Sequence, residues 1–408
     1  MSIPQLEPII AYFQETSSWK ILYQMIFTLV FLYVSKKLYH FFFKPLYYVW
    51  DDPAMLNQTP EQKRKRENKA RRRLGTLPPF PNGWYKILCS DQLLPGQVKY
   101  VNALGKEWAV FRTKSGKPGL IGAYCPHLGA DLSQGTVIGE DLVCPFHAFH
   151  FDTKGTCSKI PYQEDVPKSL KCNDVLPIKE VNNAIHVWFD VDGKEPHWQV
   201  PDILEGEPNK YKYVAQTHHR VHTHLQEIHE NGADSAHLPV VHWRTLLEVP
   251  VFWHQWGIQW EANSEHKHMS NFQVQESMKI GKWKIPGTSV KVEGHHVGPG
   301  LVHFKLQTIF GEVRVCHQLL PLEGFLQDSV YQMWVKKSVP TWFTKFLVIG
   351  WVNQYERDIV IWNQKVFLPA AQIVKNDGPI VQYRRWFKQF YSEIGTKKKF
   401  DLTDKDLF

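Results

Sequence analysis

The alternation of hydrophobic and polar residues predicts the architecture of the C-terminal half of the chain. Segments 271–280, 301–310 and 312–320 alternate with a period of two, which indicates antiparallel strands with one face turned inward. Helical spacing of apolar residues marks 222–237 and 340–367. The apolar part of the longer segment is too short to be a second membrane span, so we expect a core helix. This region is therefore predicted to be an α+β domain, an antiparallel sheet with helices.

The preceding region carries short apolar runs that are separated by turn residues. These strand-like runs lie at 108–113, 116–124, 142–152 and 184–191. Runs of this length, with glycine and proline between them, are typical of a small all-β domain with functional loops at its tips. We therefore predict a second, all-β unit ahead of the α+β domain.

The N-terminus contains an apolar segment that is long enough to consider as a membrane anchor. Residues 21–34 carry no charge, and the aromatic-rich stretch with Lys36, Lys37 and Lys44 extends them. Snorkelling lysines and interfacial aromatic residues make up the length that a span of about 20 apolar residues requires. We predict a single transmembrane helix, with a cleaved signal peptide or an interfacial helix as the alternatives.

A basic stretch at 63–73 follows this segment and changes how the net charge of +8 is interpreted. Because much of the excess charge sits in this one block, it indicates anionic lipid headgroups as the partner and no nucleic acid. The positive-inside tendency places the following domains in the cytosol, and we expect the endoplasmic reticulum membrane. The predicted boundaries are a membrane anchor at 1–50, a basic linker at 51–78, the all-β domain at 79–195, the α+β domain at 210–395 and a charged tail at 396–408.

Two short motifs in the all-β region each combine one cysteine with one histidine. Cys125 and His127 are separated by one residue, Cys144 and His147 by two, and sixteen residues lie between the pairs. Thiolate and imidazole together suit zinc or an iron–sulfur cluster. Zinc sites usually pair like ligands, whereas a 2Fe-2S cluster with two histidines on one iron needs one cysteine and one histidine from each loop. The spacing favours the iron–sulfur cluster.

The stretches CPHLGADLS and CPFHAFHFDTKGTCSKIPY resemble the two cluster-binding loops of Rieske-type non-haem iron oxygenases. This resemblance implies a Rieske 2Fe-2S cluster in which Cys125 and Cys144 hold the inner iron, and His127 and His147 hold the outer, more exposed iron. Such a centre passes single electrons. One departure is Ala148, which stands where many members of the family have glycine.

Histidines further along the chain offer a second candidate metal site. His237 and His242 stand five residues apart, and Pro239 between them is expected to break the helix after His237 and bring His242 to the same point. Two histidines and one carboxylate on one face of a metal leave positions open for dioxygen, as in non-haem Fe(II) oxygenases. The carboxylate must lie far downstream, and spacing alone does not select it.

The motif N-x-x-D-x-x-H-x4-H at 231–242 and the closing segment 358–391 resemble steroid-acting Rieske oxygenases. This resemblance implies a helix-grip-like catalytic domain in which Asp358 completes the mononuclear iron site. The rival carboxylates are Glu356 and Asp328, and a surface salt bridge is the simpler role for Asp358. Within this group, the anchored chain is most similar to the Neverland-type cholesterol 7-desaturases.

The same resemblance implies a catalytic role for Asp234. In the family this carboxylate bridges the second cluster histidine of one subunit, here His147, to an iron-binding histidine of its neighbour, here His237. The bridge couples the two metal centres and requires a homotrimer arranged head to tail. A helix-capping or solvent-facing carboxylate is the simpler alternative.

The resemblance also implies an oxygen-dependent conversion of cholesterol to 7-dehydrocholesterol in steroid-hormone synthesis. Because no Gly-x-Gly-x-x-Gly motif is present, NAD(P)H-derived electrons must arrive through a separate reductase or ferredoxin. Two alternatives stay open. One is a steroid hydroxylase of the 3-ketosteroid type, and the other is a membrane-bound Rieske electron-transfer protein without a working second site.

Overall fold

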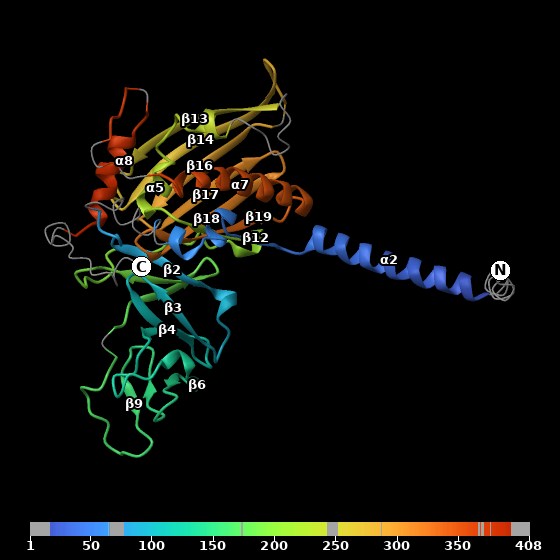
Figure 1. The fold of residues 1–408 in the computed structure, drawn as a ribbon. Coiled ribbons are helices and arrows are strands. Elements are labelled where there is room, and N and C mark those ends of the chain that lie inside the picture. The colour runs from blue at the N-terminus through green and yellow to red at the C-terminus, as the bar shows by residue number, and fades with distance from the viewer. Residues whose placement is uncertain are drawn as a thin grey trace.

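The computed structural model describes residues 17–63, 65, 77–172, 174–242, 252–286, 288–365, 368, 371–375 and 377–392. The predicted tail at 396–408 and most of the basic stretch lie outside these residues. Figure 1 shows a body of two β-rich parts, with helix α2 (Ser17–Phe43) projecting from its side. The large sheet forms one part, and the smaller sheets that carry the cluster motifs form the other.

The smaller part is built from three antiparallel sheets, which confirms its predicted all-β class. One sheet has three strands in the order β10-β11-β2, the next has β3-β4-β5, and the last has β6-β7-β8-β9. Phe111, Leu132 and Phe151 are buried in the hydrophobic core beside the four-stranded sheet. The strands are β2 Gly83–Cys89, β3 Val98–Ala103, β4 Lys106–Arg112, β5 Pro118–Gly122, β6 Thr136–Ile138, β7 Asp141–Val143, β8 His150–Phe151, β9 Cys157–Lys159, β10 Ile178–Val181 and β11 Ala184–Phe189.

The larger part is one nine-stranded sheet in the order β1-β12-β19-β18-β17-β16-β14-β13, with β15 paired to β14. Its neighbouring strands are antiparallel apart from β1 and β12, as predicted from the period-two segments. The strands are β1 Leu46–Trp50, β12 Tyr211–Val221, β13 Phe252–Ala262, β14 Met269–Ile280, β15 Trp283–Lys284, β16 Val290–Val297, β17 Leu301–Thr308, β18 Gly311–Glu323 and β19 Leu326–Lys336.

Helix α7 (Thr341–Trp362) lies across this sheet and is the predicted core helix. Val348, Val352 and Ile359 face inward at spacings of four and seven residues, and all three are buried. Aromatic contacts join the helix to the sheet, with the Tyr331 and Tyr355 ring centroids 4.9 Å apart. The remaining helices are α3 Pro53–Leu56, α5 Leu225–Glu230, α6 Leu238–Val241 and α8 Ile380–Phe387.

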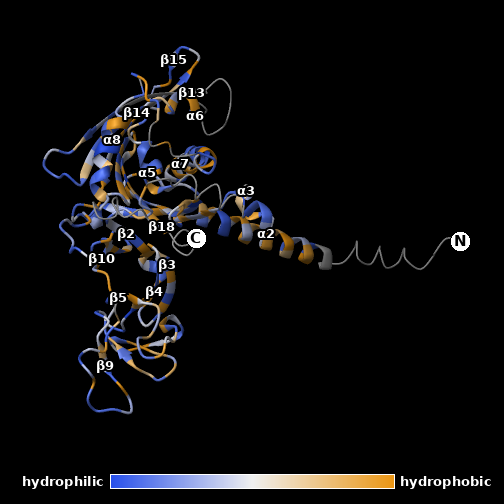
Figure 2. Cartoon of the chain, turned by 60° about the vertical axis from the view of Figure 1, so that its left-hand side comes forward, coloured by the Kyte–Doolittle hydropathy of each residue, from blue (hydrophilic) through white to orange (hydrophobic). Residues whose placement is uncertain are grey.

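Helix α2 is largely apolar but carries hydrophilic residues, among them Lys36 and Lys37 in its second half, and its most hydrophobic stretch has no buried residues (Figure 2). Residues Lys20–Phe43 are long and apolar enough to cross a membrane. The structure differs from the predicted anchor boundary at residue 50, because Leu46–Trp50 form strand β1 in the large sheet. The aliphatic and aromatic residues of this strand have the same composition as the interfacial end of an anchor, so the sequence alone does not separate the two.

A buried ion pair joins the two β-rich parts. The Lys86 ammonium on β2 lies 2.9 Å from a carboxylate oxygen of Asp328 on β19, and the lysine side chain is 1% exposed. His218 lies on the other side of the same carboxylate, with its Nδ1 atom 3.8 Å from Asp328 Oδ1. A charge this deeply buried is stable only beside its partner. A shift of one part relative to the other would separate Lys86 from Asp328, so the ion pair favours the observed arrangement of the two parts.

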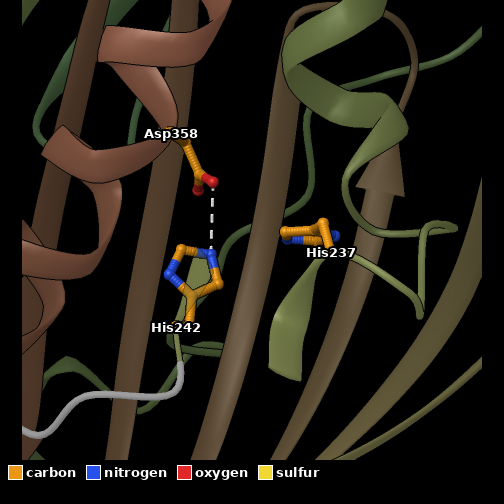
Figure 3. Close-up of side chains that lie close together, drawn as sticks. All are labelled: His237, His242 and Asp358. Atoms are coloured by element: carbon orange, nitrogen blue, oxygen red, sulfur yellow. Dashed lines mark ion pairs between the residues drawn. The ribbon is translucent and has the colours of Figure 1, made fainter. Parts of the chain in front are cut away.

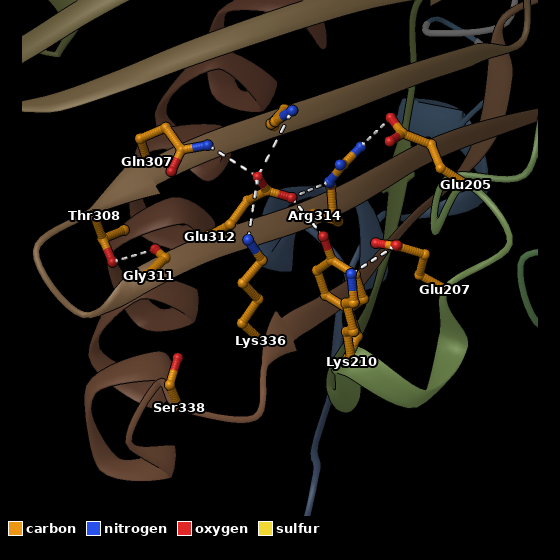
Figure 4. Close-up of polar contacts among 12 residues, drawn as sticks. Glu205, Glu207, Lys210, Gln307, Thr308, Gly311, Glu312, Arg314, Lys336 and Ser338 are labelled. Atoms are coloured by element: carbon orange, nitrogen blue, oxygen red, sulfur yellow. Dashed lines mark hydrogen bonds and ion pairs between the residues drawn. The ribbon is translucent and has the colours of Figure 1, made fainter.

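A second polar network fixes the segment between the two parts to strand β18 (Figure 4). Glu312 accepts hydrogen bonds from Tyr211, Arg314 and Gln307, and Arg314 also reaches Glu205 at 2.8 Å. Burial opposes the charged form of Glu312, but these hydrogen bonds and the adjacent guanidinium lower its pKa to about 2. The carboxylate therefore stays ionised, and the connecting segment is held against the sheet.

Candidate metal centres and the cavity beside them

The two predicted cluster loops bring their cysteines together inside the small domain. Cys125 and Cys144 are both 3% exposed, and backbone hydrogen bonds from Cys125 to Ala130 (2.8 Å) and from Cys144 to Phe149 (2.9 Å) close the two loops. Burial, and next the neighbouring Cys144 thiol, raise the pKa of Cys125 to about 11. Two buried thiols that face each other become thiolates only beside a cation. This donor pair fits the inner iron of a cluster.

The two histidines of these loops lie together on the outer side of the cysteines. The His127 and His147 ring centroids are 4.8 Å apart, with His127 exposed and His147 partly buried. His127 also stacks on Phe149 at 4.7 Å, and Phe146 lies 3.8 Å from His147. The cysteines lie deep and the histidines lie toward solvent. This arrangement fits a cluster with one buried iron and one exposed iron.

Ala148 in the second loop adopts a backbone conformation that L-residues rarely occupy. Its φ angle is +55°, and its amide donates a 3.1 Å hydrogen bond to the Cys144 carbonyl within the tight turn. An alanine in the left-handed region costs about 1–2 kcal/mol, whereas glycine is free of this penalty. The position therefore carries strain where glycine would relieve it.

We expect Ala148→Gly to raise the free energy of unfolding by about 0.5–1 kcal/mol, since relief of strain of about 1–2 kcal/mol exceeds the added chain entropy of glycine, about 0.5–1 kcal/mol. Chemical denaturation of the cluster-loaded protein, followed at the cluster absorbance, measures the change. Ala130→Gly is the matched control because Ala130 has no positive φ, and its expected effect is a loss. A loss of stability in both variants would contradict the strain argument.

The second predicted site lies at the two ends of one short helix. His237 precedes α6 and His242 follows it, and the Val241 amide donates a 2.7 Å hydrogen bond to the His237 carbonyl. Pro239 falls in the first turn of α6, so it helps to start this turn and does not end a helix as we had expected. The two rings nevertheless face the same point, with centroids 5.2 Å apart.

Each of these rings uses one nitrogen to fix its orientation. His237 Nδ1 lies 2.7 Å from the Asp234 carbonyl oxygen, which can only accept a hydrogen bond. His242 Nδ1 lies 2.9 Å from the Gln354 side-chain oxygen on α7. In each ring Nδ1 therefore carries the proton, and Nε2 is left for a metal. Gln354 was missed by sequence reasoning, although it precedes Asp358 by one helical turn on the same face of α7.

Asp358 meets the two histidines from the opposite side of the site (Figure 3). Its Oδ1 atom lies 3.2 Å from His242 Nε2, and one ligand atom from each of His237, His242 and Asp358 lies within 4.8 Å of the others. The rival carboxylates have other partners. Glu356 accepts a 2.7 Å hydrogen bond from Tyr48, and Asp328 pairs with Lys86.

The Asp234 carboxylate caps the turn that leads to the histidines. Its Oδ1 atom accepts hydrogen bonds from the backbone amides of Ala236 (3.0 Å) and His237 (3.2 Å), and its Oδ2 atom lies 3.7 Å from His237 Nδ1. Burial opposes ionisation, but these contacts with His237 hold the pKa of Asp234 below its usual value. Within one chain, Asp234 thus orients His237. The bridge to a neighbouring subunit stays a prediction.

A cavity of about 760 Å³ lies beside these three side chains, between α7 and the large sheet. This volume is within the range of about 300–1,000 Å³ that is usual for ligand sites. Most of its wall is apolar and comes from strand β14, strands β16 to β19 and helix α7. Its lining includes Phe272, Val274, Val292, Val302, Phe304, Leu306, Tyr331, Met333, Phe343, Leu347, Trp351 and Tyr355.

Comparisons with known proteins agree with the class that this fold and these sites define. Residues 83–173 match the Rieske [2Fe-2S] domain, and residues 187–391 match the 3-ketosteroid 9alpha-hydroxylase C-terminal domain. Dicamba monooxygenase has the same fold, with a TM-score of 0.58 at 17% identity over 76% of this chain and 97% of its own. The protein is a Rieske-type oxygenase.

Proteins with closer sequence similarity place the chain within that class. The cholesterol 7-desaturase nvd 1 of Ciona intestinalis is 38% identical over 80% of this chain and 72% of its own length, and the nvd protein of Xenopus laevis is 38% identical over 83% and 79%. The chain belongs to the cholesterol 7-desaturase (Neverland) family. It is therefore an oxidoreductase with a Rieske 2Fe-2S cluster and a mononuclear non-haem iron, dioxygen as its cosubstrate and a separate reductase as its electron donor.

Proposed function

We propose that this protein converts cholesterol to 7-dehydrocholesterol, with Fe(II) held by His237, His242 and Asp358. The single observation that carries the proposal is the meeting of these three side chains at the wall of a largely apolar cavity. Two neutral imidazoles and one carboxylate suit ferrous iron and leave coordination positions open. The reaction is balanced by one dioxygen, two electrons and two protons for each sterol, with two waters as the other product.

The chain's own residues supply orientation and exclude water. When bound, the iron and dioxygen supply the oxidising power, and the cluster held by Cys125, Cys144, His127 and His147 supplies single electrons. The Asp234 carbonyl and the Gln354 amide hold the two histidine rings with Nε2 directed to the site. The apolar wall keeps bulk water from the reacting carbon.

The dimensions and lining of the cavity favour a rigid apolar substrate. Its polar surface comes from the Asp358 carboxylate and a few histidines, amides and hydroxyls, and aromatic and aliphatic side chains from α7 and the sheet form most of the rest. A sterol buries fused rings and a branched hydrocarbon chain, so it gains most from such a wall. A small polar aromatic substrate would leave much of this space unfilled.

We further propose that α2 spans the endoplasmic reticulum membrane once and leaves the catalytic parts in the cytosol. The 24-residue helical segment Lys20–Phe43 is about 36 Å long, which exceeds the hydrocarbon thickness of about 30 Å. Lys345 on α7 donates a 2.8 Å hydrogen bond to the His40 carbonyl at the end of α2. The next residue, Phe346, lines the cavity and is 51% exposed. The rim of the cavity is thus close to the anchor, where a membrane sterol would arrive.

Electron transfer between the two centres is proposed to require a head-to-tail homotrimer. Asp234, which contacts His237, would then bridge to His147 of a neighbouring copy. The partial exposure of His147 and the 63% exposure of the adjacent Phe146 support a contact at this tip. Size-exclusion chromatography with light scattering on the detergent-solubilised full chain tests the trimer directly.

The reaction is tested by a sterol conversion assay in microsomes that supply NADPH and a reductase. Cholesterol is added, and extracted sterols are analysed by mass spectrometry and ultraviolet absorbance. We expect a conjugated diene at the mass of cholesterol minus two hydrogens. A product heavier by one oxygen would replace desaturation with hydroxylation. An absence of sterol product from protein shown to hold both metal centres would contradict the proposed substrate.

Hydroxylation of a 3-ketosteroid is the second candidate, because the C-terminal match is to a domain of that description. A probable 3-ketosteroid-9-alpha-monooxygenase of Rhodococcus rhodochrous is also 25% identical over 79% of this chain and 82% of its own. The higher identity of the cholesterol 7-desaturases over a similar share of the chain favours desaturation. A carrier of electrons alone would have no use for three converging ligands at a cavity wall.

Gln354→Leu is expected to weaken iron binding by about 10–100-fold, because it removes the group that orients His242. The measurement is iron retained at the mononuclear site during dialysis against a chelator. Gln354→Glu keeps an acceptor at the same place and is expected to retain most of the affinity. Equal loss of iron in the two variants would show that the contact to His242 does not matter.

A further inference from the structure

A cluster of three buried histidines lies in the cavity wall and is not used by the proposed iron site. His229 on α5, His296 on β16 and His317 on β18 all line the cavity and are at most 3% exposed. The His229 ring lies 5.5 Å from the ring of His296 and 5.4 Å from that of His317. Three imidazoles are therefore gathered in a wall that is otherwise largely apolar.

Two of these histidines have protein partners. His296 contacts Ser270 Oγ through Nδ1 (2.8 Å) and the His229 carbonyl through Nε2 (3.2 Å). His317 Nε2 lies 2.8 Å from Ser329 Oγ, and Ser329 in turn contacts the Tyr355 hydroxyl at 2.6 Å. These contacts fix the rings of His296 and His317. The side chain of His229 is the one whose hydrogen-bonding role in the cluster has yet to be explained.

Neither ring nitrogen of His229 forms a hydrogen bond of normal geometry within the described part of the chain. The Pro299 carbonyl lies near the ring, and because it can only accept, it favours the N–H on its own side. Burial, and next the neighbouring His317 and His296, hold the pKa of His229 well below its usual value, so the ring is neutral. A buried polar atom without a partner costs about 1–3 kcal/mol. The remaining nitrogen is thus an unused acceptor.

We propose that His229 accepts a hydrogen bond from the hydroxyl group of the sterol and thereby selects an alcohol over a 3-ketone. The inference rests on the proposed function and identifies the sterol hydroxyl as the group that the cavity recognises. A hydroxyl donates the proton that the free nitrogen needs, whereas a ketone offers only a second acceptor. A hydrocarbon without oxygen leaves the nitrogen unsatisfied.

The position of His229 agrees with oxidation in the ring next to the hydroxyl-bearing ring. His229 precedes the iron ligand His237 by eight residues on the same connection. From the other side, the His317 ring lies 5.5 Å from that of Tyr355, which is one helical turn before Asp358. The histidine cluster and the triad thus line the same cavity. The hydrocarbon tail is left with the apolar wall of Phe343 and Leu347.

The test is competition binding to the purified full chain in detergent, with tritiated cholesterol as the probe. Unlabelled cholesterol, 5-cholestene and cholest-5-en-3-one are the competitors, and all three share the cholestane skeleton with the 5,6 double bond. We expect cholesterol to bind about tenfold more tightly than 5-cholestene, as one hydrogen bond in a dry site predicts. The ketone is expected to bind no better than 5-cholestene.

In His229→Phe the preference for cholesterol over 5-cholestene is expected to fall to about twofold or less, because an aromatic ring still fills the site but the acceptor nitrogen is removed. His229→Gln keeps a polar side chain and is expected to retain part of the preference. His303→Phe is the matched control, because His303 is also buried with an unpartnered nitrogen, Nε2, yet does not line the cavity. Cluster absorbance shows that each variant is folded.

The outcomes separate this inference from the proposed function. A hydroxyl preference that survives in His229→Phe would overturn the role of His229 and leave cholesterol as the substrate. Equal binding of cholesterol and 5-cholestene by the unaltered protein would do the same. Absence of specific binding of tritiated cholesterol to the unaltered, cluster-loaded protein would overturn both. Loss of the preference in His303→Phe as well would show a general effect of packing and would also contradict the assignment.

Discussion

His237→Ala is expected to lower sterol oxidation by more than about 100-fold while the cluster spectrum is unchanged. Loss of a group that only orients a metal ligand typically costs about 10–100-fold, and loss of the ligand itself should cost more. His237 is the partly buried member of the triad and lies at the cavity wall, so a water would replace the imidazole there. Iron content should fall from about three to about two per chain, because the cluster keeps its own irons.

The control for this variant is His266→Ala, since His266 is exposed and does not line the cavity. It should keep its full iron content and its activity. Two measurements are made on the same preparations, namely metal analysis and the absorbance of the oxidised cluster. Retention of about three irons by His237→Ala would contradict the proposed ligand set. Retention of activity with only the cluster irons would contradict the need for a second site.

Asp328→Ala is expected to destabilise the protein by about 3–5 kcal/mol, because it leaves the ammonium of Lys86 buried without its partner. The same variant should loosen the contact between the two β-rich parts, which this pair joins. Denaturant unfolding followed by tryptophan fluorescence measures the loss. Lys291→Met, which breaks an ion pair whose lysine is 53% exposed, is the matched surface control and should change stability by about 1 kcal/mol or less.

The double variant Lys86→Met/Asp328→Leu distinguishes an unpaired charge from a packing defect. Replacement of a buried ion pair by apolar side chains is often neutral, so this variant should be more stable than Asp328→Ala. Equal loss in the two variants would mean that packing, and not the isolated charge, explains the effect. The cycle is completed with Lys86→Met, which leaves the Asp328 carboxylate without its cation.

The contribution of this pair also depends on pH in a defined direction. Burial opposes both charges, but the two groups hold each other ionised, so the pKa of Asp328 is lowered and that of Lys86 is raised. The stabilisation is therefore complete between the ordinary values of 3.8 and 10.5. It declines as the pH falls from 3.8 toward the lowered pKa of Asp328, and also as the pH rises from 10.5 toward the raised pKa of Lys86. The stability difference between the unaltered protein and Asp328→Ala should follow this window.

Features set by local spacing were accessible from the sequence. Cys125, His127, Cys144 and His147 lie within 23 residues, so the two loops could be recognised without knowledge of the fold. The sheet followed from strict alternation, and the core helix followed from its apolar spacing. Asp358 needed a resemblance, because it lies 116 residues beyond His242 and only the packing of α7 brings the two together.

Features set by contacts between distant elements were not accessible in this way. His229, His296 and His317 come from one helix and two strands, and nothing in their spacing marks them among 20 histidines. Lys86 and Asp328 lie in different parts of the molecule. The sequence therefore gives no reason to assign Asp328 to an ion pair with Lys86 and not to the iron site. Strand β1 was missed because LYYVW reads equally well as an interfacial end of the anchor.

The connection between α2 and β1 consists of two residues, Lys44 and Pro45, and it joins this apolar helix directly to the edge of the catalytic sheet. A long flexible linker would let the catalytic domains reorient freely relative to a membrane. Here the helix is followed after two residues by a strand whose five residues are all paired in the sheet, so the direction of the helix relative to the sheet is restricted. With the proposed membrane span, the tilt of α2 in the bilayer would set the angle between the mouth of the cavity and the membrane surface, and a change of bilayer thickness would rotate the whole catalytic part.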